Sequence, residues 1–303
     1  MSRNILITGG TGFLGSELTK RLTERGFSVR HLSRNPVTEN DIPVFKWDIK
    51  RKIIDDRALE DVECIIHLAG ANIASERWSQ ERKKEIFDSR VKSSELLYYI
   101  LSNKKHQVKS VISASAIGYY GHTGDRLVTE ESVAGFDYLA YTCKQWEHAI
   151  NKVTELGIRT CNVRIGFVLA NNGGGLPRLL SPIRFYMGAP LGDGLQYVSW
   201  IHIDDLCNIF IKAVEDSTMS GPYNAVAPNP ITNKELIKLA ANILDKSLFL
   251  PSIPAGLLKM WMGEMATLVL TSTNASAKKI IEKGYHFKFP DIEPALRSVL
   301  AEE

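Results

Sequence analysis

Three glycines near the N-terminus have the spacing of a loop that binds phosphate. Gly9, Gly12 and Gly15 lie where an apolar segment, residues 4–8, meets a segment of helical periodicity. A loop without side chains lets the backbone approach a pyrophosphate, and the positive end of the following helix attracts the negative charge. The sequence therefore predicts a dinucleotide site. The loop residues expected to contact the cofactor are Gly9, Thr11, Gly12, Phe13, Leu14 and Gly15.

The residues after the second predicted strand indicate which nicotinamide cofactor fits. An NAD site would place Asp or Glu there for the ribose 2′-hydroxyl, whereas this chain has Ser33 and Arg34. A guanidinium can bind a 2′-phosphate through two parallel hydrogen bonds, and a carboxylate would repel it. We therefore expect NADP (NADPH) rather than NAD; the alternative is that Arg34 is only a solvated loop charge. Asp48 is expected either to accept from the adenine amino group or to cap a turn.

Strands and helices alternate through the first half of the chain. This alternation predicts a Rossmann-like α/β fold with a doubly wound parallel sheet, because parallel strands need crossover helices. The predicted strands are residues 4–8, 27–33, 64–68, 110–116 and 160–169, and the predicted helices are 13–26, 82–101 and 139–156. We assign residues 1–170 to an NADP-binding domain, with contributions from residues 200–230.

The pattern changes after residue 170. Glycine and proline become frequent, and helices are expected at residues 204–215, 233–244 and 255–270. Residues 171–303 are therefore expected to form a smaller, mostly C-terminal portion. It would supply substrate-side loops and a helical domain at about residues 250–300.

Composition limits the classes of function. The chain has 303 residues, of which 44% are hydrophobic and 23% charged, and its net charge is +3. Such a near-neutral chain gives no reason to expect nucleic acid as a partner. No stretch approaches the roughly 18 continuous apolar residues of a membrane span, and no secretory signal is recognised, so a cytoplasmic protein with no membrane partner is expected. Scattered cysteines and histidines predict no metal site.

Several motifs, taken in order, resemble the NAD(P)-dependent epimerase/dehydratase family of the extended short-chain dehydrogenase/reductase superfamily. They are Thr8–Gly15, His67–Gly70, Ser113–Ser115 with Tyr120–Gly121, and Gly192–Gln196 followed by Trp200–Asp205. The segment from Pro254 to Leu300 is similar to the extra C-terminal domain of a branch described as sugar-nucleotide epimerases. The resemblance covers nearly the whole chain. It implies the fold above, with a small-molecule substrate such as a nucleotide sugar.

The resemblance also implies roles for individual residues. Leu68, Ala69 and Gly70 would pass beside the cofactor ribose, with Ser113 nearby, and Ser115 would contact the reacting carbinol. The residues expected on the substrate side are Arg164, Gln196, Trp200 and His202. For Arg164 an internal ion pair is the alternative, and for His202 the alternative is a cap on the following helix.

The chain departs from the family at the catalytic base. Members use Tyr-x-x-x-Lys on one helical face, where the ammonium lowers the pKa of the phenol. Here Leu139 and Cys143 occupy those two positions. Tyr141 is the candidate base, with Lys144 on the same face beside the cofactor, and Tyr120 is a second candidate on the preceding loop. Tyr119 and His122 are further alternatives on that loop.

Two interpretations therefore remain open. The chain is either an NADP-dependent epimerase, dehydratase or reductase, or an inactive NADPH-binding sensor or scaffold. The missing Tyr-x-x-x-Lys pair favours the sensor, whereas Ser115 and the substrate-side motif favour the enzyme. The resemblance also implies a homodimer formed through the helices at residues 82–101 and 139–156.

Overall fold

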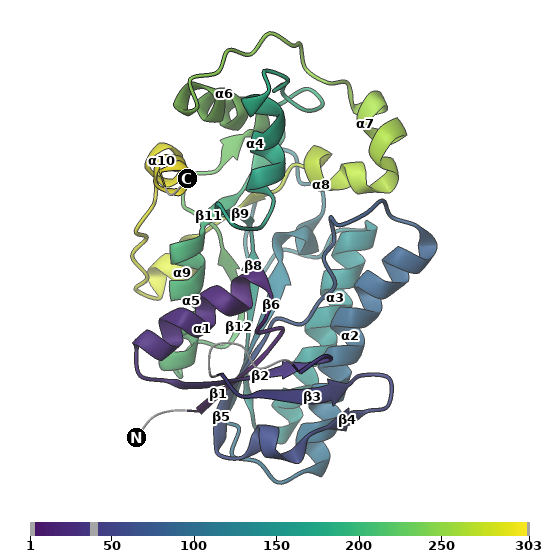
Figure 1. Cartoon of the computed structure of the whole chain (residues 1–303), viewed down its shortest axis with the longest axis vertical. Coiled ribbons are helices and arrows are strands. Elements are labelled where there is room, and N and C mark those ends of the chain that lie inside the picture. Colours follow the sequence, from purple (N-terminus) through teal and green to yellow (C-terminus); the bar gives the residue numbers. More distant parts are fainter. Residues whose placement is uncertain (1–3, 37–41, 302–303) are drawn as a thin grey trace.

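An eight-stranded sheet forms the centre of the protein in a computed structural model that describes residues 4–36 and 42–301 (Figure 1). Neighbouring strands are parallel, except that the short edge strand β4 runs antiparallel to β3. In spatial order the strands are β12 (Gly221–Ala225), β8 (Arg159–Ile165), β6 (Ser110–Ala116), β5 (Val62–His67), β1 (Asn4–Thr8), β2 (Ser28–Ser33), β3 (Val44–Asp48) and β4 (Ile53–Ile54). The predicted doubly wound α/β fold is confirmed.

Helices cover both faces of this sheet. In Figure 1, α1 (Phe13–Glu24) and α5 (Ile203–Glu215) lie on one face, and α2 (Gln80–Asn103) and α3 (Tyr138–Asn151) lie on the other. The strands supply apolar side chains to both layers: Ile5 packs in the core of α1 and α5, whereas its neighbour Leu6 packs in the core of α2 and α3. This burial on both faces is why the centre of β1, Ile5–Ile7, is continuously apolar.

A third core lies above the carboxyl ends of the strands. Trp200 is fully buried there among apolar side chains of three helices. These helices are α4 (Leu176–Arg184), α6 (Asn233–Ile243) and α10 (Ile292–Leu300). Three two-stranded sheets complete the region: β9 (Phe167–Leu169) with β11 (Trp200–His202), β10 (Tyr197–Val198) with β13 (Ile231–Thr232), and β7 (Leu127–Val128) with β14 (Asn274–Ala275). The short helix α9 (Lys278–Glu282) follows β14.

Two predicted elements are divided by glycines. The expected strand at 160–169 becomes β8 and β9, separated at Gly166, where a Cβ atom would lie 2.4 Å from the carbonyl oxygen of Ser199. The expected helix at 255–270 becomes α7 (Ala255–Met262), a 3₁₀ turn and α8 (Thr267–Leu270). Gly263 breaks it with a φ of 64°, a backbone conformation that favours glycine.

Another predicted helix changes from α-helical to 3₁₀ geometry near its end. The helix expected at residues 139–156 is α-helical as α3, and residues Lys152–Leu156 continue as a 3₁₀ helix. Across the described ranges, 4–36 and 42–301, the helices are too short or too polar to cross a membrane.

Candidate functional site

The glycine loop leaves β1 and enters α1 at the carboxyl edge of the sheet. Gly9 has a φ of +72°, and a Cβ atom on Gly15 would lie 2.4 Å from the carbonyl oxygen of Gly9. Glycine at both positions is therefore required by the turn and by the close packing of α1 on it. Gly12 is the N-cap of α1 and offers no side-chain cap. The first N–H groups of α1 are thus available to an anion.

A buried histidine supports the loop from beneath. A Cβ atom on Gly10 would lie 2.3 Å from the ring of His31, which leaves no room for a side chain. Nε2 of His31 hydrogen-bonds to Oγ1 of Thr19 at 2.8 Å, and Thr19 donates to the carbonyl oxygen of Gly15. Burial lowers the pKa of His31. Sequence reasoning missed this support, since a histidine within a strand carries no motif.

A second buried histidine connects the ends of β1 and β5. Nδ1 of His67 lies 2.7 Å from Oγ1 of Thr8, and Nε2 of His67 contacts the hydroxyls of Ser93 and Ser94 on α2. The same Thr8 oxygen accepts from the backbone N–H groups of Leu68 and Ala69. The network therefore positions the segment 68–70 that we expect beside the cofactor ribose.

Acid is expected to destabilise the protein through His67. Burial lowers the pKa of His67 to about 3, against 6.5 for an exposed histidine. The unfolded chain then binds a proton that the folded chain does not, so stability is lost as pH falls from 6.5 toward 3, by at most about 1.4 kcal/mol per pH unit. Urea unfolding between pH 7.5 and 5 should show a shallower pH dependence for His67→Gln than for the unmodified protein. The matched control is His286→Gln, at an exposed position. Equal slopes in all three proteins would contradict a neutral, buried His67.

The residues expected near the adenosine end lie on β2 and β3. Arg34 is exposed and has no ion-pair partner among residues 4–36 and 42–301. The hydroxyl of Ser33 is engaged with the backbone of Asn35. Asp48 acts as a turn cap by accepting from the N–H groups of Lys50 and Arg51, and these hydrogen bonds lower its pKa.

The remaining predicted cofactor residues differ in exposure. Thr11 is exposed in the loop, and Leu14 is partly buried. Phe13 packs so closely on Gly173 that a Cβ atom there would lie 2.4 Å from the phenyl ring. Ser113 is fully buried and donates to the backbone of Ala114.

A buried charged network lies at the carboxyl end of β6. Ser115, which is 2% exposed, donates its hydroxyl hydrogen bond to Oε1 of Glu147 at 2.6 Å. Arg164 on β8 binds both oxygens of the same carboxylate at 2.8 Å. Although burial alone would lower the pKa of Arg164, the hydrogen bonds and charge of Glu147 raise it. The internal ion pair considered for Arg164 is therefore present.

Tyr120 completes this network. Its hydroxyl donates to Oδ1 of Asn224 at 2.6 Å and accepts from Nη1 of Arg164 at 2.9 Å. Burial raises the pKa of Tyr120 to about 12, so the phenol stays protonated at neutral pH. The guanidinium carbon of Arg164 also lies 3.6 Å from the centre of the Tyr119 ring. Three predicted site residues, Ser115, Tyr120 and Arg164, thus form one cluster.

Helix α3 presents apolar groups to the turn that follows β6. A Cβ atom on Gly118 would lie 3.6 Å from Cβ of Leu139 and 3.9 Å from Sγ of Cys143. Burial raises the pKa of Cys143 to about 12. Tyr141 and Lys144 are exposed and lie outside the charged network; Tyr141 stacks on Phe87 of α2.

The predicted substrate-side residues are held by internal hydrogen bonds. The amide nitrogen of Gln196 donates to the carbonyl oxygens of Leu191 and Val269, while its buried Oε1 has no partner within residues 4–36 and 42–301. Nε1 of Trp200 donates to the backbone of Asn229. Nδ1 of His202 accepts from the N–H of Asp204 and so caps α5, which is the alternative role considered for this residue.

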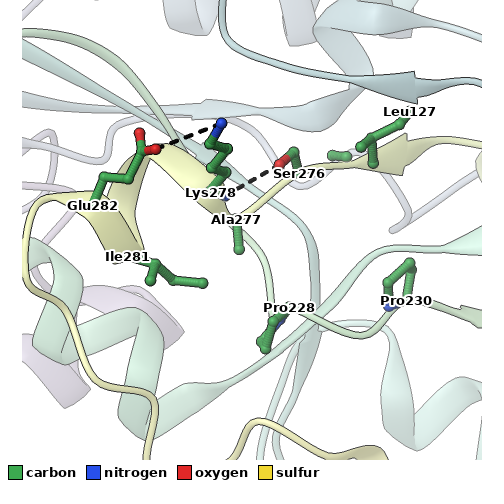
Figure 2. Close-up of a pocket in the computed structure, with 9 residues that line it drawn as sticks. Leu127, Pro228, Pro230, Ser276, Ala277, Lys278, Ile281 and Glu282 are labelled. Atoms are coloured by element: carbon green, nitrogen blue, oxygen red, sulfur yellow. Dashed lines mark hydrogen bonds and ion pairs between the residues drawn. The ribbon is translucent and has the colours of Figure 1, made fainter.

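A pocket of about 280 Å³ lies apart from these groups, between β7, β14, α9 and the loop at residues 228–230 (Figure 2). Its charged lining residues, Lys278 and Glu282, pair with each other across one turn of helix. Apolar groups and two prolines form most of the remaining wall. The two charged groups of the pocket are therefore already in contact with each other.

The comparisons with known proteins agree with this architecture. The family model described as "NAD dependent epimerase/dehydratase family" matches residues 5–226, and a domain of unknown function, DUF1731, matches residues 253–299. The chain is 34% identical to Epimerase family protein YfhF of Bacillus subtilis (strain 168) over 302 residues, covering 99% of this chain and 98% of that protein.

Two solved structures are also similar. The crystal structure of human epimerase family protein SDR39U1 (isoform 2) with NADPH superposes with a TM-score of 0.90 at 28% identity, covering 99% of this chain and 100% of that one. The nucleoside-diphosphate sugar epimerase of Corynebacterium glutamicum gives a TM-score of 0.81 at 32% identity. This second match covers 100% of this chain and 59% of the other.

Proposed function

Because the chain belongs to the NAD-dependent epimerase/dehydratase family, we propose that it is an NADP-dependent enzyme that exchanges hydride with a small carbonyl or hydroxyl compound such as a nucleotide sugar. The observation that carries the proposal is the buried contact between Ser115 and Glu147, with Arg164 on the same carboxylate. Burying a hydroxyl, a carboxylate and a guanidinium together costs free energy, and apolar side chains would fill the same space without that cost. Their place at the carboxyl edge of a doubly wound sheet is where ligands bind in such folds.

The residues at the glycine loop fit a dinucleotide. The uncapped N-terminus of α1 and the bare backbone at Gly12 would hold the diphosphate, and residues 68–70 would lie along the nicotinamide ribose. NADPH supplies a hydride to a carbonyl carbon, and NADP⁺ accepts one from a carbinol. The similar crystal structure of human SDR39U1 with NADPH supports the choice of cofactor.

Ser115 and Glu147 would handle the proton that accompanies the hydride. Because the Ser115 hydroxyl donates to Glu147, its oxygen is left to accept a hydrogen bond from a substrate hydroxyl. In the oxidative direction, the substrate proton would pass to Oγ of Ser115 while the serine proton moves to the carboxylate. Arg164 would hold that carboxylate in place. This proton path would take the role of the family's tyrosine, whose position Leu139 occupies. Tyr141 would then take no part in the reaction.

Arg34 is expected to select the cofactor. Arg34→Asp should weaken NADPH binding by about 100-fold, because it replaces a charge-assisted hydrogen bond to the 2′-phosphate with repulsion. NADH affinity should stay the same or improve. Fluorescence titration of both cofactors checks this, with Lys105→Asp as the control on the exposed loop that precedes β6. Equal NADPH and NADH affinities in the unmodified protein would remove the argument for the 2′-phosphate.

One observation favours a second function, that of an inactive NADPH sensor. Leu139 and Cys143 lie against the turn at Gly118, and these two apolar side chains occupy the positions of the family's tyrosine and lysine. A sensor would bind NADPH and leave it unoxidised with every carbonyl compound offered. An enzyme would either oxidise NADPH with at least one small carbonyl compound, or convert a nucleotide sugar to an epimer or dehydration product in the presence of catalytic NADP⁺. Assays of steady-state NADPH oxidation and of NADP⁺-dependent conversion across such a panel therefore separate the two functions. The homodimer through α2 and α3 and the cytoplasmic location stay predictions.

A further inference from the structure

Arg90 on α2 is a cation at the carboxyl edge of the sheet that neither the motifs nor the buried network uses. Its side chain is partly exposed, and Nη1 donates to the carbonyl oxygen of Ile86 one turn earlier at 3.0 Å. The guanidinium carbon lies 5.3 Å from the centre of the Trp146 ring on α3. A Cβ atom on Gly70 would lie 3.1 Å from this guanidinium carbon. The Arg90 side chain therefore lies between α3 and the segment 68–70 that follows β5.

The charge of Arg90 is not balanced by a carboxylate. No Asp or Glu among residues 4–36 and 42–301 forms an ion pair with it, whereas Arg82 on the same helix pairs with Glu76 and Glu85. Burial lowers the pKa of Arg90, and the charge of Arg82 acts in the same direction. A partly buried cation without a counterion is costly, and an anion that binds beside it would recover that cost.

The position of Arg90 relates it to the reacting end of the cofactor. A Cβ atom on Gly9 would lie 3.1 Å from the backbone of Leu68, so the glycine loop touches the start of the segment 68–70. Arg90 touches the far end of this segment, at Gly70. The stacking of the Arg90 guanidinium on the ring of Trp146 places the cation against α3. The diphosphate would thus lie at one end of the segment and Arg90 at the other.

We propose that Arg90 binds an oxyanion group of the substrate next to the carbon that exchanges hydride, and so supplies a cation in place of the lysine whose position Cys143 occupies on α3. This inference rests on the proposed NADP-dependent function. A planar guanidinium with free N–H groups suits the two oxygens of a carboxylate or the oxygens of a phosphate. Two sources offer that chemistry: the carboxylate of a small oxo acid, and the diphosphate of a nucleotide sugar. In either case the substrate is anionic close to its reacting carbonyl.

Binding to the complex of the full chain with NADPH tests this proposal without requiring the true substrate. Oxalate serves as the probe for a carboxylate, with uncharged oxamide as its analogue of similar shape, and UDP serves as the probe for a diphosphate. Calorimetry should detect oxalate or UDP but not oxamide. Arg90→Met should weaken the binding of the detected anion by about 10- to 100-fold, and Arg90→Lys by less, because an ammonium keeps the charge but not the paired hydrogen bonds.

Controls separate this proposal from folding and from the proposed function. Lys92→Met removes a cation that lies two residues away and pairs with Asp88 on the exposed side of α2, and it should leave anion binding unchanged. Thermal unfolding and NADPH affinity show whether Arg90→Met still folds, with Arg90→Lys as the milder variant. If NADPH itself fails to bind, the proposed function is wrong. If NADPH binds but neither anion does, or if Arg90→Met binds the anion as tightly as the unmodified protein, only the role of Arg90 is wrong.

Discussion

Gly12→Val is expected to abolish NADPH binding while leaving the fold intact. Gly12 has a φ of −80°, which valine adopts without strain. In the described part of the chain, the one atom within 4 Å of a Cβ atom at this position would be the carbonyl oxygen of Gly9, at 3.2 Å. The added methyl groups would therefore occupy the approach of the pyrophosphate to the N-terminus of α1. Losing several charge-assisted hydrogen bonds should raise the dissociation constant by more than about 100-fold. Fluorescence titration with NADPH measures it.

Two other glycines give the matched controls for this variant. Gly256→Ala places a methyl group in α7 where a Cβ atom would meet no atom within 4 Å, so binding and stability should be kept. Gly15→Val should instead lower stability, because its Cβ would lie 2.6 Å from Cα of Gly10. NADPH binding by Gly12→Val at close to unmodified affinity would mean that the loop does not hold the diphosphate.

Breaking the ion pair between Glu147 and Arg164 is expected to cost about 3–5 kcal/mol of unfolding free energy. Arg164→Met would leave the carboxylate of Glu147 buried without its cation, and Glu147→Leu would leave the guanidinium without its anion. The double variant should recover much of the loss, because apolar side chains of similar volume need no counterion. Urea unfolding of the two single variants and the double variant gives the coupling between the residues.

An exposed pair provides the comparison. Arg297 and Glu293 form an ion pair on α10 with side chains 60% and 53% exposed. Arg297→Ala should change the unfolding free energy by less than about 1 kcal/mol. If Arg164→Met costs no more than Arg297→Ala, the buried network does not exist in solution as described.

Local patterns sufficed to predict much of the fold. The strands β1 and β6 have the predicted bounds: β1 has an apolar centre, and β6 consists of apolar residues and small serines that are nearly all buried. The glycine loop was predicted for the same reason: its spacing, the strand before it and the helix after it are all local in sequence. The divisions at Gly166 and Gly263 were missed, because each depends on what packs against the glycine.

The charged network could be predicted only in part. Ser115 and Arg164 were named, yet the carboxylate that joins them was not, because Glu147 lies on a separate helix, 32 residues after Ser115 in sequence. Arg90 was not predicted for a related reason. It belongs to no motif, and its proposed role depends on the lack of a carboxylate beside it among the described residues, which the sequence does not show. Gln196, Trp200 and His202 were expected to face the substrate; in the structure each hydrogen-bonds to the backbone, while Oε1 of Gln196 and Nε2 of His202 have no partner among residues 4–36 and 42–301.

The most direct test of the central claim follows a label from the cofactor. The protein would be incubated with NADPH that carries deuterium on either face of nicotinamide C4, together with nucleotide sugars and small oxo acids. Mass spectrometry would then detect label in the products. We expect one compound class to gain a deuterium from one face only, and Ser115→Ala to bind NADPH normally but transfer the label far more slowly. Tight NADPH binding with no label transfer to any compound, together with no NADP⁺-dependent conversion of any nucleotide sugar, would contradict the enzyme and favour the sensor.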